Sequence, residues 1–95
     1  MNKKDENYIY YLVAQNLKKQ RKIKGLTQSQ FAELCGYSDG FIMNIESPNY
    51  YQTFSLGTIW KFADVLEIDI RKLFEPLEEI KKWYFKLEHS SNFFI

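Results

Sequence analysis

Residues 26–47, LTQSQFAELCGYSDGFIMNIES, contain the pattern that decides the fold. Thr27 is a natural N-cap for a helix, and Gln30 at the third helical position completes a capping box. Gly36 ends that helix, because glycine adopts a left-handed backbone conformation without steric cost. Ser38 then caps another helix. The stretch therefore predicts two short helices joined by a glycine turn.

Four further helices are expected around this pair. The first runs from about Asp5 to Lys24 and stops at Gly25. A fourth begins after the cap Ser55, a fifth spans about 69–74, and a sixth follows Pro76. No segment alternates polar and apolar residues for long enough to predict a strand. The fold class is therefore expected to be all-α, with one domain in residues 1–75 and a helical extension in 76–95.

Apolar residues at three- and four-residue steps mark the sides of these helices that should face the core. In chain order they are Tyr10, Val13, Leu17 and Gln20; Phe31, Ala32, Leu34 and Cys35; Phe41, Ile42 and Ile45; Leu56, Ile59, Phe62, Ala63 and Leu66; Ile70, Leu73 and Phe74; and Leu77, Ile80, Trp83 or Tyr84, and Leu87.

The net charge of +1 is unevenly distributed along the 95 residues. Residues 1–24 carry seven basic and two acidic side chains, a net +5, whereas residues 25–75 carry three basic and seven acidic side chains, a net −4. Residues 76–95 balance. The positive charge therefore lies on the first helix and not on the helix pair, so that helix would have to supply any cations for an anionic partner.

The sequence shows no sign of catalysis, a metal site or a membrane span. The single Cys35 is expected to be a buried small hydrophobe, and the single His89 a solvated residue of the extension. Cysteine and histidine do not cluster at metal-ligand spacing, and the glycines form no phosphate loop. No apolar run approaches ~20 residues. We expect a cytoplasmic protein that is not an enzyme and takes no cofactor and no small-molecule substrate.

At the level of motifs, LKKQRKIKGLTQSQFAELCGYSDGFIMNIE resembles the phage-repressor and Cro-like (XRE-type) helix-turn-helix family. SLGTIWKFADVLEIDIRKLF resembles the two closing helices of that family. The resemblance covers about Val13 to Phe74. It implies a five-helix lambda-repressor-like domain that binds double-stranded DNA with its third helix, Ser38–Glu46, with the extra C-terminal helix added to it.

The resemblance also implies individual roles. Arg21 and Glu46 fall where the family commonly places an ion pair between the first and third helices. Asn44 suits a bidentate contact with adenine, and Asp39 an acceptor for a cytosine amine. The full set of residues expected to contact DNA is Thr27, Gln28, Ser38, Asp39, Gly40, Met43, Asn44, Tyr50 and Gln52.

Three features depart from the family pattern. The third helix has no strong guanine reader, Ser47-Pro48 replaces the usual polar-glycine end, and the loop Asn49–Phe54 lacks Lys and Arg. Each missing phosphate cation weakens DNA binding and its dependence on salt. The monomer is therefore expected to bind DNA with modest affinity.

The C-terminal extension allows two interpretations that are compatible with each other. Its aromatic helix either folds back onto its own domain or forms a homodimer interface, because interface cores are enriched in aromatics. Two functions stay open as well. The first is a transcriptional regulator, whether phage repressor, restriction-modification controller or antitoxin-like autoregulator. The second is a protein-interaction module that keeps the fold with little DNA binding.

Overall fold

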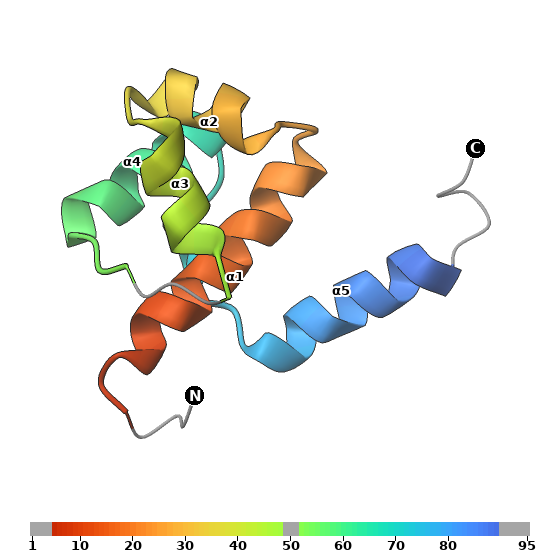
Figure 1. The fold of residues 1–95 in the computed structure, drawn as a ribbon. Helices are drawn as coiled ribbons and strands as arrows, with labels where there is room; N and C mark the ends of the chain where they lie inside the picture. The colour runs from red at the N-terminus through yellow and green to blue at the C-terminus, as the bar shows by residue number, and fades with distance from the viewer. Residues whose placement is uncertain (1–4, 49–51, 90–95) are drawn as a thin grey trace.

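The computed structural model describes residues 5–48 and 52–89 and is helical throughout its regular elements (Figure 1). The elements in chain order are α1 Tyr8–Ile23, α2 Gln28–Cys35, α3 Asp39–Glu46, α4 Leu56–Leu66, the 3₁₀ helix η1 Ile70–Phe74, and α5 Leu77–His89. The predicted all-α fold and its six elements are confirmed. The first helix starts three residues later than expected, and the fifth is a 3₁₀ turn instead of an α-helix.

Helix α1 is the central element. It contacts η1, α3, α4 and α5, with α2, α3 and α4 on one side of it and α5 on another (Figure 1). Phe31 and Phe62 from α2 and α4 lie with ring centroids 5.5 Å apart in the core, against Leu17 of α1. Because Ile42 and Ile45 of α3 belong to the same buried cluster, the orientation of both α2 and α3 depends on the whole core.

Most of the predicted inward positions are buried or pack against the core, but two are not. Leu34 is 59% exposed and Leu56 is 73% exposed, so both expectations were wrong. Leu34 points about 100° away from the centre of the side of α2 formed by Phe31, Ala32 and Cys35. By its position around the helix, Leu56 lies on the same side of α4 as the buried residues. It is the first residue of that helix, however, and lies at the edge of the core.

Local signals fix where the helices begin and end. The capping box of Thr27 and Gln30 is present in full, and Ser38 and Ser55 each accept a backbone N–H from the first turn of their helices. Gly36 has φ of 77°, the left-handed conformation that its position required. Helix α4 also ends in the left-handed region, at Glu67 with φ of 55°.

Helix α5 packs along α1 through one apolar side. Ile80 is buried, whereas Trp83, Tyr84 and Leu87 are half-buried, as the helical spacing predicted. The Asn16 side chain of α1 donates to the Glu75 carbonyl at 2.9 Å, which fixes the chain just before α5 begins. Within the described residues, no helix is long and apolar enough to cross a membrane.

Cys35 is buried in the core cluster, and burial raises the pKa of its thiol to about 11. A thiol with that pKa stays protonated at neutral pH, so Cys35 has the chemistry of a small packing residue.

Candidate nucleic-acid interface

A buried ion pair joins the first and third helices. Arg21 Nε donates to Glu46 Oε2 at 2.8 Å, and Arg21 Nη2 donates to Glu46 Oε1 at 2.7 Å. Arg21 Nη1 also donates to the Leu26 carbonyl at 2.6 Å, in the turn before α2. Both side chains are more than nine-tenths buried. This fork-to-fork geometry holds α3 at a fixed angle to α1.

Gln28 extends the same network. Its Nε2 donates to Glu46 Oε1 at 3.1 Å, so the side chain is half-buried between α2 and α3. The Gln28 side chain, which was expected to contact DNA, thus makes a hydrogen bond that helps to position α3. The backbone N–H of Gln28 remains at the N-terminus of α2, where a helix favours an anion.

Thr27 is exposed, and its hydrogen-bonding groups complete the cap of α2. Its Oγ1 accepts from Gln30 N at 3.0 Å, and its backbone N–H donates to Gln30 Oε1 at 2.9 Å. Thr27 therefore has a structural role as the cap of α2, and any contact with DNA would come in addition to that role.

The side of α3 that faces away from the core carries the expected base-contacting residues. Ser38, Asp39 and Gly40 are exposed, Met43 is 52% exposed, and Asn44 is half-buried. The opposite side carries Ile42, Ile45 and Glu46, which are all buried. Within the described residues, α3 therefore presents a continuous outward surface at the end of the helix where bases would be contacted.

The N-termini of α2 and α3 are linked by one contact that the sequence did not indicate. The Ser29 hydroxyl donates to Asp39 Oδ2, and both residues are exposed. Ten residues separate the two, and the contact depends on how the turn at Gly36 folds α3 back across α2. No local pattern in the sequence could have identified Ser29.

The loop after α3 is described only in part. Tyr50 lies outside the described residues. Gln52 is half-buried, and its Nε2 donates to the Thr53 carbonyl at 2.9 Å. Gln52 thus has a local hydrogen-bond partner in the neighbouring residue of the loop.

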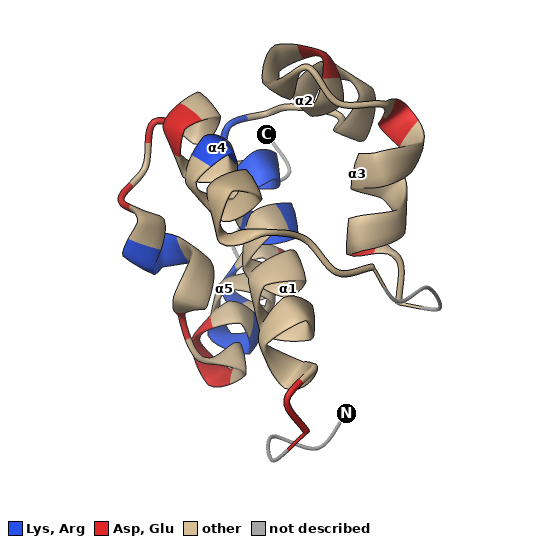
Figure 2. Cartoon of the chain, turned by 90° about the vertical axis from the view of Figure 1, so that its left-hand side faces the viewer, with Lys and Arg blue, Asp and Glu red and all other residues tan. Residues whose placement is uncertain are grey.

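The charges of this surface are negative. No Lys or Arg occurs between residues 25 and 60, while the exposed Glu33 and Asp39 lie on α2 and α3. Glu46 adds no charge to this surface, because it is buried and paired with Arg21. Figure 2 shows the contrast, with the Lys and Arg segments on α1, α4, η1 and α5 and only acidic or uncharged segments on α2 and α3. Any phosphate contact made by α2 and α3 must therefore use backbone N–H groups and neutral side chains.

Two lysines of α1 that were candidates to supply cations face α5 instead. Lys19 is buried, lies 3.7 Å from Glu75, and stands 5.9 Å from the ring centroid of Trp83. Lys22 stands 5.6 Å from the ring centroid of Tyr84. Both ammonium groups thus serve the contact between α1 and α5.

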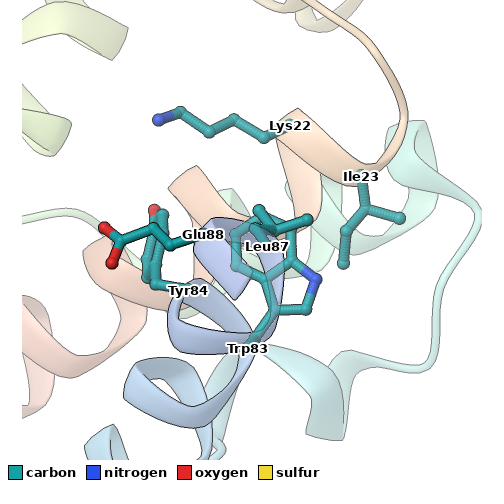
Figure 3. Close-up of a pocket in the computed structure, with 6 residues that line it drawn as sticks. All are labelled: Lys22, Ile23, Trp83, Tyr84, Leu87 and Glu88. Atoms are coloured by element: carbon teal, nitrogen blue, oxygen red, sulfur yellow. The ribbon is translucent and has the colours of Figure 1, made fainter. Parts of the chain in front are cut away.

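An apolar groove of about 640 Å³ lies between α1 and α5 (Figure 3). Its lining consists of Lys22, Ile23, Trp83, Tyr84, Leu87 and Glu88. Burial raises the pKa of the Tyr84 hydroxyl; the charge of Glu46 adds to this rise and the charge of Arg21 opposes it. The groove is distinct from the outward surface of α3, since neither α2 nor α3 lines it.

His89 is exposed and stacks on Phe85, with ring centroids 4.0 Å apart. Its Nδ1 lies 2.8 Å from the Phe85 carbonyl oxygen. Over residues 5–48 and 52–89, no three His, Cys, Asp or Glu side chains gather in a way that could hold a metal ion.

Comparison with known proteins identifies the helix pair. The family described as helix-turn-helix matches residues 17–73, which is more than half of the chain. No curated protein and no solved structure matches. The matched residues include the ion pair, the glycine turn and the whole outward surface of α3, as the resemblance implied. This chain is therefore a member of the XRE-type helix-turn-helix family of DNA-binding regulators.

Proposed function

We propose that this protein is a transcriptional regulator that recognises a specific operator through α3 and binds it as a homodimer. The observation that carries the proposal is the outward surface of α3, where Asp39, Gly40 and Met43 are exposed while the opposite side is locked into the core. Because α3 is packed against the core on one side and exposed on the other, it can enter a DNA major groove, which is wide enough for one helix.

The chemistry of this surface favours direct base contacts over phosphate contacts. The Asn44 amide can donate to N7 and accept from N6 of adenine, and the Met43 side chain can contact a thymine methyl. Gly40 carries no side chain, so the backbone of α3 can approach the bases closely. Affinity from these base contacts depends on the DNA sequence, whereas affinity from contacts to phosphates does not.

The salt dependence of binding tests the proposal. Because residues 25–60 lack Lys and Arg, we expect a slope of log Kobs against log salt of about −2 to −4 for the dimer. Between 50 and 200 mM salt the affinity should then fall by roughly 16- to 250-fold, and not by the ~10³–10⁵ of proteins with six to ten phosphate contacts. Fluorescence anisotropy on a selected operator measures this slope. A slope steeper than about −6 would show that many cations outside α2 and α3 contact the duplex.

Dimerisation through α5 would raise the operator affinity, because two weak half-sites bound together give the affinity that one lacks. Trp83 and Leu87 line the groove against α1, whereas Phe85 is 61% exposed on the other side of α5, beside Lys81, Lys82 and Lys86. Along α5, Lys81 precedes Phe85 by one turn and Glu88 follows it. Two antiparallel copies of α5 crossing at Phe85 would therefore bring Lys81 of one copy close to Glu88 of the partner subunit.

Phe85→Glu should convert the dimer to a monomer in analytical ultracentrifugation, because the substitution places a charge at the centre of the proposed interface. Operator affinity should fall with it. Trp60→Glu is the matched control, since Trp60 on α4 is 60% exposed and belongs to a different surface. A wild-type protein that is monomeric at high micromolar concentration, or a dimer that survives Phe85→Glu, would refute this interface.

The negative charge of α2 and α3 supports a second candidate function, a protein-interaction module that binds little DNA. A basic protein partner would be favoured by the same Glu33 and Asp39 that repel phosphates. Asn44→Ala separates the two candidates. Loss of both DNA binding and cellular function with an intact fold supports the regulator, while unchanged cellular function supports the interaction module.

A further inference from the structure

The contact between Ser29 and Asp39 gives the outward surface of α3 a specific acceptor. Asp39 is the first residue of α3 and Ser29 the second residue of α2, so the contact joins the two helix N-termini. The hydroxyl donates, because an ionised carboxylate only accepts. One oxygen of Asp39, Oδ2, is thus fixed. No hydrogen bond to the other, Oδ1, is found within residues 5–48 and 52–89.

The major groove offers few groups that such an acceptor can bind. Cytosine presents only the N4 amine, a donor, whereas guanine presents two acceptors, and thymine one acceptor and a methyl group. Adenine presents a donor beside an acceptor, which a carboxylate disfavours. A carboxylate at the start of α3 therefore selects cytosine partly by repelling the alternatives. The repulsion between the Asp39 carboxylate and the acceptor atoms of the other bases is not offset on α2 and α3, because these helices carry no Lys or Arg.

We propose that Ser29 is a positioning residue that fixes the Asp39 carboxylate for one cytosine in each half-site. A free aspartate side chain samples several rotamers, and only some of them point an oxygen at a base edge. Binding Oδ2 to the Ser29 hydroxyl restricts those rotamers before DNA arrives, so less entropy is lost on binding. The inference rests on the proposed function, since it requires α3 to enter the groove.

Selection of duplexes from a random pool tests the inference with the full chain. The wild-type protein should enrich a motif with a C·G pair at one position in each half-site. Asp39→Asn should abolish that preference, because an amide also donates. Ser29→Ala should reduce the preference about five- to tenfold, and Ser29→Thr should restore it through the same hydroxyl. The double variant should match Asp39→Asn alone, because Ser29 acts only through Asp39.

Glu33→Gln is the matched control for charge. Glu33 is exposed on α2, and its replacement removes one negative charge as Asp39→Asn does. It should raise affinity for all sequences slightly and leave the base preference unchanged. Thermal melts of each variant establish that the fold is intact, which is expected because all three positions are exposed.

Two other outcomes are distinguishable. If the wild-type protein enriches a motif and Ser29→Ala leaves every position of it unchanged, the role of Ser29 is refuted while the proposed function stands. If no motif is enriched by the wild-type protein at low salt, the proposed function itself fails, and the inference fails with it.

Discussion

Glu46→Ala should lower the free energy of unfolding by about 3–5 kcal/mol, the largest loss that we expect from a single substitution. The substitution leaves the Arg21 guanidinium buried without its carboxylate partner, and it also removes the acceptor of Gln28. The desolvation of Arg21 is then uncompensated, since its remaining bond is to the neutral Leu26 carbonyl. Urea unfolding followed by circular dichroism measures the loss.

Two further variants make the result interpretable. Glu33→Ala removes an exposed glutamate from α2 and should change stability by less than about 0.5 kcal/mol. Replacing both partners, as Arg21→Met with Glu46→Leu, should recover most of the stability, because a buried ion pair is often close in stability to well-packed apolar side chains. If Glu46→Ala cost less than about 1 kcal/mol, the pair would not hold α1 and α3 together as described.

Asn44→Ala should reduce binding to the selected operator by about 1–3 kcal/mol for each half-site, and by about twice that for the dimer. The physical reason is the loss of a bidentate amide contact from the outward surface of α3. Binding to unrelated DNA should change little, because that binding depends on phosphate contacts. Anisotropy titrations on the operator and on a scrambled duplex measure both quantities.

Asn7→Ala is the matched control for this result, because Asn7 is also half-buried and lies at the start of α1, outside the helix pair. Its operator affinity should equal that of the wild-type protein. Equal losses on the operator and on the scrambled duplex would place Asn44 among residues that support the fold, and would remove it from the base-contacting set.

Residues with local signals were predictable from the sequence. Thr27, Gly36 and Ser38 determine the ends of α2 and α3 by chemistry that acts within four residues, and the structure places each as expected. Leu34 and Leu56 were misassigned, because hydrophobicity alone does not show where a helix side ends or where a core has its edge. Nothing in the sequence predicted the left-handed backbone conformation of Glu67, since glycine is the residue that normally marks such a position.

Contacts between distant residues were not predictable in the same way. The bond between Gln28 and Glu46 gives Gln28 a structural partner on α3 that the sequence did not indicate, and its expected contact with DNA stays a prediction. Lys19 and Lys22 were identified as cations, but only the packing of α5 shows that they stand near Trp83 and Tyr84. Sequence periodicity gives the side of a helix, while the identity of the partner comes from the tertiary arrangement.

The central claim is that the outward surface of α3 recognises a DNA sequence. Its most direct test is the selection of duplexes from a random pool at low salt, with the wild-type protein and Asn44→Ala side by side. We predict that the wild-type protein enriches one motif in two copies about 34 Å apart, and that Asn44→Ala loses one adenine position in each copy. Equal, weak retention of all sequences by the wild-type protein would contradict the claim.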